Sequence, residues 1–269
     1  MQMKNALTIA GSDSSGGAGI QADLKTFSAH GVFGLSVITA VTAQNTRGVF
    51  GIADIPPEII KKQLAAVFED ILVAAVKIGM LSQSETIKIV AAGLREYRAA
   101  NIVLDPVMVS KSGCHLLAPQ AVEALIKELL PLADIVTPNI PEAEVMTGLS
   151  ITTLYEMEKA ARAIFQMGAK NVLLKGGHLA NEATDLLFDG QSVQLFPAVR
   201  IATKNTHGTG CTLSSAIAAN LAKGFAVAEC VARAKEYITT AIEHSLELGG
   251  GAGPVHHFYA LYQKAGLIP

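Results

Sequence analysis

The sequence has no tryptophan, few aromatic residues and little charge. Aromatic residues make up 5% of its 269 residues and charged residues 16%, whereas hydrophobic residues make up 50%. So large an apolar share with so little charge excludes intrinsic disorder. Because the apolar residues are mostly Ala, Val, Ile and Leu, they favour buried parallel strands under aliphatic helices over an aromatic-rich β-sandwich.

The chain also lacks a strong excess of either charge. Its formal net charge is −2 and its isoelectric point is about 6.4. This balance excludes a broadly basic surface that would attract nucleic acid or an anionic membrane, and we expect neither as a partner.

Long hydrophobic runs are missing too. The mean hydropathy of +0.38 is high for a soluble protein, but no uninterrupted apolar run approaches the ~18 residues that a spanning helix needs. Lys4 and the short apolar run at 6–10 do not make a signal peptide. The three cysteines, Cys114, Cys211 and Cys230, contain no CxxC pair. They fit neither a disulfide framework nor a zinc site, so we expect a reduced, cytoplasmic location.

Short apolar runs alternate along the chain with segments of helical period. The runs typical of buried strands are residues 7–10, 35–41, 73–78, 102–104, 135–136 and 172–174. Helical stripes lie at residues 64–71, 122–130 and 154–165. This alternation predicts βαβ units with right-handed crossovers, and hence an α/β fold with a mostly parallel sheet.

The last third of the chain has a different pattern. Residues 184–188 and 193–196 flank Asp189-Gly190 and predict a β-hairpin with a type I′ turn. Helices are then expected at about residues 209–223, 227–248 and 257–264. The Gly-rich stretch at 249–254 could be a linker, but too little chain follows it to form a second domain. We therefore interpret residues 1–269 as one domain.

Polar and charged residues follow the expected strands. They include Asp13, Gln44, Asp105, Glu142 and Lys175. Ligands of an open parallel sheet bind outside the carboxyl ends of its strands. These residues therefore predict a functional edge of the sheet, with a coincidence of loop composition as the alternative.

One glycine-rich loop follows the first strand. Residues 17–22 (GAGIQA) fit the dinucleotide pattern G-x-G-x-x-G/A, which alone is a weak signal. Six residues separate Gly17 from the end of the strand run, and the second run ends in Gln44-Asn45 rather than in an acid that could hold a ribose. A dinucleotide-binding dehydrogenase is therefore disfavoured, and a plain strand-to-helix turn is the alternative. No Gly-x4-Gly-Lys-Ser/Thr phosphate loop occurs.

A second glycine-rich loop gives a stronger signal. Residues 205–212 (NTHGTGCT) precede a long Ala-rich segment that is expected to be helical. Free N–H groups at a helix start bind anions, and glycines let a phosphate approach the backbone. A thiol in that first turn, here Cys211, is expected to have a lowered pKa and to accept a proton. The alternative is an ordinary N-cap loop in which Cys211 is a small buried residue.

These loops belong to a longer series of motifs. Residues 11–25 (GSDSSGGAGIQADLK) and 204–212 (KNTHGTGCT) enclose AQNT at 43–46, KIGM at 77–80, DPVM at 105–108, TPNIPEAE at 137–144 and KGGH at 175–178, and GPVHH follows at 253–257. In this order, over nearly the whole chain, they resemble the signatures of the hydroxymethylpyrimidine/phosphomethylpyrimidine kinases of thiamine synthesis.

The resemblance implies a ribokinase-like fold, a three-layer sandwich with a mostly parallel central sheet, helices on both faces and no large lid domain. It implies two reactions: ATP phosphorylates the hydroxymethyl group of 4-amino-5-hydroxymethyl-2-methylpyrimidine, and a second ATP converts the monophosphate to the diphosphate. The implied cofactors are ATP and Mg²⁺, with a monovalent cation as a further candidate, and the expected assembly is a homodimer.

The resemblance also assigns the catalytic residues. Gly208, Thr209, Gly210 and Cys211 would form the anion hole for the transferring phosphoryl group, and Cys211 would accept the substrate proton. The wider superfamily carries Asp at this position, whereas this family carries Cys. Lys175 would neutralise phosphate charge, with a surface Lys that closes a strand as the alternative.

Further residues are expected around the nucleotide and its metal. Asn139 and Glu142 resemble the family's N-x-x-E element, which positions Mg²⁺ and phosphates, and Asp105 would complete the metal surroundings. Helix capping is the alternative for the first two, and both roles can hold at once. Asn205 and Lys235 would lie near the nucleotide.

The pyrimidine pocket is assigned to Gly11, Asp23, Gln44, Met80 and Val107. A Gln amide can match both the donor and the acceptor on an aminopyrimidine edge. Met80 and Val107 would supply apolar contact, with core packing as their alternative. A solvated acid early in a helix is the alternative for Asp23.

Small and polar residues at 109–115 suggest a flap that excludes water on closure. Family members often carry an acid where Cys114 stands, and we expect an inert exposed thiol there, with an approach of Cys114 to Cys211 on flap closure as the alternative. Cys230 is expected in the core, and His256 and His257 are expected to be structural or related to oligomerisation.

Two other functions compete. A pyridoxal kinase of the same subgroup would bind an aromatic heterocycle with a hydroxymethyl arm in the same pocket. A non-catalytic paralogue that binds the pyrimidine would be expected to lose Lys175, Asn139, Glu142 or the loop at 208–211. All of these are present.

Overall fold

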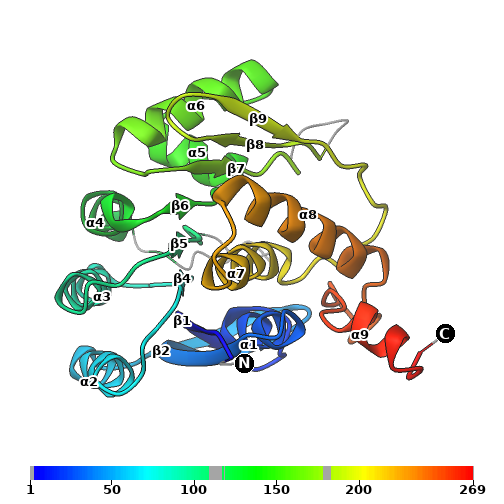
Figure 1. The fold of residues 1–269 in the computed structure, drawn as a ribbon, viewed down its shortest axis with the longest axis horizontal. Coiled ribbons are helices and arrows are strands. Elements are labelled where there is room, and N and C mark those ends of the chain that lie inside the picture. The colour runs from blue at the N-terminus through cyan, green and yellow to red at the C-terminus, as the bar shows by residue number, and fades with distance from the viewer. Residues whose placement is uncertain (1–2, 109–116, 118, 178–182, 269) are drawn as a thin grey trace.

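The computed structural model of the chain describes residues 3–108, 117, 119–177 and 183–268. The strands in these residues are β1 (Asn5–Asp13), β2 (Phe33–Asn45), β3 (Gly48–Asp54), β4 (Val76–Ile78), β5 (Ile102–Leu104), β6 (Ile135–Val136), β7 (Val172–Leu174), β8 (Asp185–Phe188) and β9 (Val193–Phe196). Within the same residues they form one nine-stranded sheet in the order β3-β2-β1-β4-β5-β6-β7-β8-β9 (Figure 1). The strands from β2 to β7 in this order pair in parallel, and β3, β8 and β9 pair antiparallel at the two edges.

Helices cover both faces of this sheet. The helices on one face are α2 (Pro57–Phe68), α3 (Ser84–Glu96), α4 (Pro119–Ala124), α5 (Ile140–Thr147) and α6 (Leu154–Gln166) (Figure 1). Those on the other face are α1 (Gly19–Ala29), α7 (Thr209–Ala222) and α8 (Val227–Glu243), and the short α9 (Tyr259–Lys264) lies beyond them. The predicted α/β fold with a mostly parallel, doubly covered sheet is confirmed.

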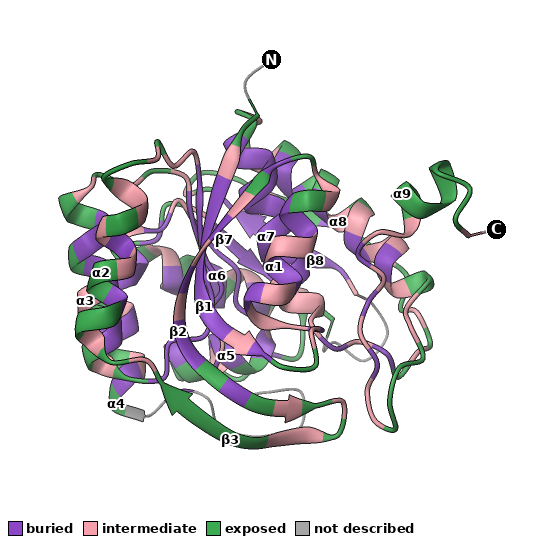
Figure 2. Cartoon of the chain, turned by 90° about the horizontal axis from the view of Figure 1, so that it is seen from below, coloured by how far each residue is buried: buried purple, intermediate pink, exposed green. Residues whose placement is uncertain are grey.

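The central strands are short aliphatic runs because both of their faces are buried. Every residue of β4, β5, β6 and β7 is buried. Two apolar clusters, one on each side of the sheet, take up the alternate side chains of these strands. Figure 2 shows the buried sheet between the inward sides of its helices, with exposed residues along β3 and α9. No helix in the described ranges has both the length and the apolar character needed to cross a bilayer.

The six predicted strand runs all lie in or overlap β1, β2, β4, β5, β6 and β7. The edge strand β3 was not predicted, because most of its residues are exposed and it contains two glycines instead of an apolar run. The predicted hairpin is confirmed as β8 and β9, but the predicted two-residue turn is wrong. Residues 189–192 connect the strands, and the Asp189 carboxylate accepts hydrogen bonds from the backbone N–H groups of Gln191 and Ser192.

The predicted helices after the hairpin are present with shorter bounds. Helix α8 ends at Glu243, five residues before the predicted end at 248, and α9 begins at Tyr259 rather than at 257. The stripe at 122–130 is not one regular helix. Helix α4 continues into a π-helical turn (Leu125–Leu129) and then a 3₁₀ turn (Leu130–Leu132) that contains Pro131, which cannot donate a helical hydrogen bond.

Candidate active site

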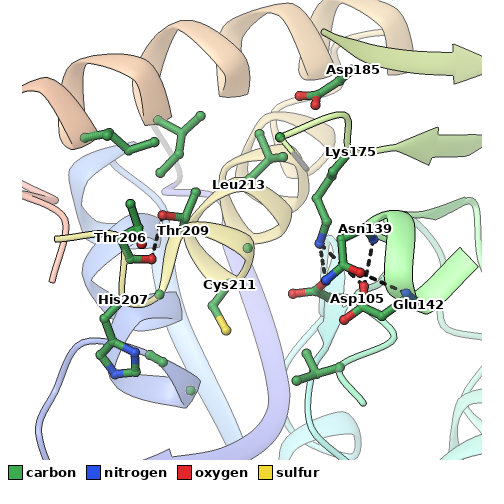
Figure 3. Close-up of a pocket in the computed structure, with 18 of the residues that line it drawn as sticks. Asp105, Asn139, Glu142, Lys175, Asp185, Thr206, His207, Thr209, Cys211 and Leu213 are labelled. Carbon is green, nitrogen blue, oxygen red and sulfur yellow. Dashed lines mark hydrogen bonds and ion pairs between the residues drawn. The ribbon is translucent and has the colours of Figure 1, made fainter. Parts of the chain in front are cut away.

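A cavity of about 1080 Å³ lies at the carboxyl ends of the parallel strands, beside the start of α7 (Figure 3). Most of the predicted site residues line it: Gly11, Gln44, Met80, Asp105, Val107, Asn139, Glu142, Lys175, Gly208, Thr209, Gly210, Cys211 and Lys235. Two predicted residues, Asp23 and Asn205, are not among its lining residues. The polar residues that follow separate strands thus meet at one edge of the sheet, as the topology requires.

The start of α7 opens into this cavity. Gly208 caps the helix with φ 79°, in the left-handed region, and a Cβ at this position would overlap the carbonyl oxygen of Gly17. Glycine is therefore required here both by the backbone conformation and by the close approach of the loop that follows β1. Thr209 Oγ1 donates to the carbonyl oxygen of Thr206 at 2.8 Å and holds the turn. The first N–H groups of a helix are unpaired within it, so this end presents hydrogen-bond donors to the cavity.

Cys211 stands in the first turn of α7, between His207 on one side and the group of Asp105, Glu142 and Lys175 on the other (Figure 3). Burial raises the pKa of its thiol to about 11, and the nearby Lys77 charge opposes this rise without overcoming it. The predicted lowering of this pKa is wrong, because loss of water around the sulfur, together with the Asp23 and Asp105 charges, outweighs the Lys77 charge.

Lys175 is bound between two buried carboxylates. Its Nζ lies 3.0 Å from Asp105 Oδ1 and 4.0 Å from Glu142 Oε2. Burial alone would lower the pKa of Lys175, but the two carboxylates raise it above its ordinary value. Burial would likewise raise the pKa of Asp105, but Lys175 and Lys77 lower it. Both groups are therefore charged at neutral pH, and the surface-lysine alternative for Lys175 does not describe its position.

Glu142 has the opposite tendency. Burial raises its pKa to about 7, the Asp105 charge adds to this rise, and Lys175 opposes it. Its carboxylate also caps α5: Glu142 Oε2 accepts from the backbone N–H of Asn139 at 2.8 Å, and Asn139 Oδ1 accepts from the backbone N–H of Glu142 at 2.9 Å. Both residues line the cavity as well, so capping and a place in the site hold at once.

The carboxylates of Asp105 and Glu142 fit a hard divalent cation. Both line one cavity and present carboxylate oxygens, the hard ligands that Mg²⁺ prefers. Within the described ranges no three His, Cys, Asp or Glu side chains gather as a metal-binding group. Such an ion would take its remaining ligands from water and phosphate oxygens, as Mg²⁺ commonly does.

Four of the five residues predicted for the pyrimidine border the cavity, and Asp23 does not. Gly11, Gln44, Met80 and Val107 all line it, and a Cβ on Gly11 would come within 2.6 Å of Met80 Cε. The backbone oxygen of Met80 accepts from Thr39 Oγ1 at 2.9 Å, which fixes this segment against β2. Met80 is nearly buried yet borders the cavity, so core packing and ligand contact are compatible.

The structure corrects the placement of Asp23. Its carboxylate is fully buried beneath the cavity and accepts from Lys77 Nζ at 2.9 Å to each oxygen, from Thr8 Oγ1 at 2.6 Å and from Ser215 Oγ at 2.6 Å. These four hydrogen bonds from three donor groups use its acceptor positions. Asp23 therefore supports the floor of the site and is neither a ligand contact nor a solvated acid.

Of the two residues predicted near the nucleotide, Lys235 lines the cavity and Asn205 does not. Asn205 is buried, and its Oδ1 accepts from the backbone N–H of Gly253 at 3.0 Å, so it joins two loops instead of facing the cavity. Lys235 lines the cavity, but its Nζ donates to Asp185 Oδ2 at 2.6 Å and to the carbonyl oxygen of Ala183 at 2.8 Å. Lys235 can contribute charge to this wall while its amine is held by these partners.

Sequence reasoning missed two further residues of the cavity. Lys77 interrupts the apolar strand β4, and a lone lysine in a buried strand was a readable signal for a buried ion pair. His207 lies within the C-terminal signature and binds Asp13, the last residue of β1, with Nε2 2.8 Å from Asp13 Oδ2. Since 194 positions separate the two residues in the chain, no local pattern could have paired them.

The remaining predictions concern cysteine and histidine. Cys230 is buried in the apolar cluster beside α7 and α8, as predicted. His257 is buried, with Nε2 3.0 Å from Thr212 Oγ1, and His256 contacts the ring of Tyr259. The predicted flap at 109–115, including Cys114, lies outside the described residues.

Comparisons with known proteins give a family, close relatives and similar solved structures. Residues 13–256 match a family described as phosphomethylpyrimidine kinase. The chain is 60% identical over 258 residues to the hydroxymethylpyrimidine/phosphomethylpyrimidine kinase of Rhizobium meliloti, which covers 94% of this chain and 97% of that relative. It is 56% identical over 257 residues to the thiamine biosynthesis bifunctional protein ThiED of Geobacter sulfurreducens, which covers 95% of this chain and 52% of that longer protein. Among solved structures, an ADP complex of Bacillus subtilis pyridoxal kinase superposes with a TM-score of 0.91 and 41% identity, covering 97% of this chain and 99% of that one.

Proposed function

The chain belongs to the phosphomethylpyrimidine kinase family, and from this premise we propose that it phosphorylates 4-amino-5-hydroxymethyl-2-methylpyrimidine and then its monophosphate, with ATP as donor, in thiamine biosynthesis. The observation that carries the proposal is the meeting, in one cavity, of the open start of α7, Cys211 and the Lys175 ion pair. These groups are what phosphoryl transfer to an alcohol needs.

The phosphoryl group that is transferred lies at the start of α7. N–H groups at the start of α7 stabilise the charge that develops on its oxygens, apart from the Thr209 N–H, which is bonded to the carbonyl oxygen of Thr206. Lys175 neutralises part of the same charge, and Asp105, 3.0 Å away, holds the lysine in place. The start of α7 and the Lys175 side chain need not move far during the reaction, because the fold fixes both before substrate binds.

Mg²⁺ would be held by Asp105 and Glu142 together with phosphate oxygens and water, beside Asn139. When bound, it neutralises phosphate charge and helps to align the nucleotide for transfer. Burial and the Asp105 charge raise the pKa of Glu142, and the charges of Asp105 and Glu142 raise the pKa of Lys175.

Cys211 acts as base in the first reaction. The substrate hydroxyl oxygen attacks the γ-phosphorus of ATP, the bond from that phosphorus to the bridging oxygen of ADP breaks, and the hydroxyl proton passes to the sulfur. The sulfur must be a thiolate for this, and a pKa of about 11 leaves a small thiolate share at neutral pH. The first reaction is therefore expected to accelerate with rising pH.

The second reaction needs no such base. Its nucleophile is the monophosphate, whose second pKa of about 6 leaves it ionised at neutral pH. One cavity whose base is mostly protonated at neutral pH can thus perform both transfers, provided that it binds the monophosphate where it earlier bound the alcohol.

The two ends of the cavity divide the ligands. The pyrimidine lies among Gly11, Gln44, Met80 and Val107. The nucleotide base lies at the opposite end, against the apolar wall of Leu213, Ile238 and Ile242, with residues 198–203 beside them and Lys235 near the phosphates. This wall is the part of the cavity suited to an adenine ring.

Further parts of the proposal concern the whole protein. One continuous sheet through residues 5–196 supports a single kinase domain. We place the enzyme in the cytoplasm as a homodimer, with Mg²⁺ and a monovalent cation as its ions. Light scattering tests the dimer, and turnover with and without K⁺ tests the monovalent cation.

Product analysis tests the proposed function. The protein is incubated with ATP and the pyrimidine alcohol, and separately with ATP and pyridoxal. We expect the pyrimidine monophosphate first and the diphosphate after it. The similarity to pyridoxal kinase makes pyridoxal phosphorylation the second candidate, and a monophosphate formed from pyridoxal alone would overturn the main proposal. Binding of the pyrimidine without any product would identify a non-catalytic paralogue.

A further inference from the structure

His207 connects the anion-binding loop to the pyrimidine end of the cavity. Its side chain lines the cavity, and the residue as a whole is 8% exposed. Its Nε2 lies 2.8 Å from Asp13 Oδ2 and 3.4 Å from the side-chain amide of Gln44. A Cβ on Gly17 would overlap the imidazole ring, so the ring is packed tightly against that loop. The same residue precedes Gly208, the cap of α7.

The hydrogen atom on this imidazole can be placed from its partner. Asp13 accepts from the backbone N–H groups of Ser15, Gly17 and Ala18 and from Ser15 Oγ, besides His207. Burial would raise the pKa of Asp13, but hydrogen bonds from His207, Ser15 and Ala18 lower it to about 2. The carboxylate is therefore ionised and can only accept, so His207 Nε2 carries a hydrogen and donates.

This donor decides which way the Gln44 amide faces. One end of the amide lies 3.4 Å from His207 Nε2, and the other lies 3.1 Å from Thr42 Oγ1. Two N–H donors do not bond to each other, so the amide oxygen belongs on the His207 side. The amide nitrogen then donates to Thr42 Oγ1, whose own hydrogen goes to the carbonyl oxygen of Ser12 at 3.0 Å. The single hydrogen on His207 Nε2 goes to Asp13 Oδ2 at 2.8 Å, and the Gln44 oxygen, 3.4 Å from Nε2, lies beside this N–H as a longer, shared acceptor.

We propose that His207 is a positioning residue that fixes the orientation of the Gln44 amide and thereby makes the cavity select an aminopyrimidine edge over other heterocycles. This rests on the proposed function. With its oxygen drawn toward the His207 N–H and its nitrogen bonded to Thr42 Oγ1, the amide keeps one oxygen lone pair and one N–H for the ligand. An aminopyrimidine edge offers the complementary exocyclic amine and ring nitrogen. Pyridoxal lacks that adjacent pair, so it gains nothing from the fixed amide.

Substitution of His207 tests this selectivity. The readouts are KM for the pyrimidine alcohol, KM for ATP, and the inhibition constant of pyridoxal as a competitor of the pyrimidine. His207→Leu is expected to raise KM for the pyrimidine about tenfold, the effect of one lost pair of oriented hydrogen bonds. KM for ATP and the pyridoxal constant should stay within about twofold. His207→Gln, which keeps a donor near the Nε2 position, should restore KM for the pyrimidine to within about threefold.

The control is His257→Leu. His257 is buried to a similar degree and contacts α7 through Thr212, but it does not line the cavity. It should lower thermal stability without changing the ratio between the pyrimidine and pyridoxal constants. An equal change in that ratio for both leucine variants would assign the effect to general loosening of α7 and overturn the proposal.

A double-mutant cycle shows whether His207 acts through Gln44. In a Gln44→Ala background, His207→Leu should raise KM for the pyrimidine by less than a further twofold. A further tenfold rise in KM in that background would overturn the proposal. If His207→Leu does not fold, Thr42→Val is used instead, because it removes the hydrogen-bond partner at the other end of the amide. It should raise KM for the pyrimidine and leave the inhibition constant of pyridoxal unchanged, and no change in KM would overturn the proposal. Failure of the wild-type enzyme to phosphorylate the pyrimidine is a separate result, which refutes the proposed function and is seen before any variant is made.

Discussion

Replacing Glu142 by glutamine should make the ligand-free protein more stable at pH 8 while inactivating it. The carboxyl is 6% exposed and lies close enough to Asp105 for like-charge repulsion, which together with burial raises its pKa from 4.5 to about 7. Folding therefore favours the protonated carboxyl. The stability contributed by this proton is fully present below pH 4.5 and is lost as the pH rises through 7.

The magnitude follows from the size of the shift. A rise of this size corresponds to about 3 kcal/mol of stability lost between pH 4.5 and pH 8. Glutamine keeps the capping bond, because its side-chain oxygen can accept from the backbone N–H of Asn139 as Glu142 does. Since it carries no charge, Glu142→Gln should recover most of the loss, which is about 5 °C in Tm for a chain of this length.

The assay is thermal unfolding of the ligand-free protein, followed by circular dichroism at pH 5 and pH 8. Glu156 offers a matched control because it occupies the same capping position in α6, but hydrogen bonds from Thr152 and Thr153 lower its pKa. Glu156→Gln should reduce stability by the same small amount at both pH values. A Tm difference between wild type and Glu142→Gln that does not change between pH 5 and pH 8 would refute the reasoning.

Three further predictions concern the floor and the anion-binding end of the cavity. Lys77→Met should destabilise the protein by about 3–5 kcal/mol, since it leaves the Asp23 carboxylate buried without a cation. In denaturant unfolding, the double variant Lys77→Met/Asp23→Leu should recover most of this loss, and no recovery would contradict the ion-pair account. Gly208→Ala should abolish both phosphorylations and lower Tm, because the added Cβ meets the oxygen of Gly17, and an active variant would mean that this approach is not required. Lys175→Met should lower kcat for both phosphorylations by about 10²–10³, as measured by product formation with each substrate, and loss of a single step would place the lysine elsewhere in the mechanism.

The strands of the sheet were predictable because burial on both faces leaves a continuous aliphatic run. Residues 102–104 and 172–174 were found to the residue as β5 and β7. The edge strand β3 was not, since an exposed strand carries no such run. The site followed from the same logic, because parallel strands bring their carboxyl ends to one edge whatever the distance between them in the chain.

What the sequence could not show is which way a polar side chain faces and what surrounds it. Asp23 lies in a signature motif, but its partner Lys77 is 54 positions away and turns it into a buried ion pair. Asn205 lies in the other signature and faces a loop instead of the cavity. The pKa of Cys211 was predicted from the helix start alone, and the burial that reverses its direction is a property of the whole fold.

The central claim is that one cavity performs two phosphorylations and needs Cys211 as a base in the first. The most direct measurement is the rate of each step with Cys211→Ala, with the pyrimidine alcohol and the pyrimidine monophosphate supplied separately. We expect the first step to fall by about 10²–10⁴ and the second to stay within about tenfold of wild type, because its nucleophile is already ionised. An unchanged rate for the first phosphorylation, or an equal loss in both, would contradict the account.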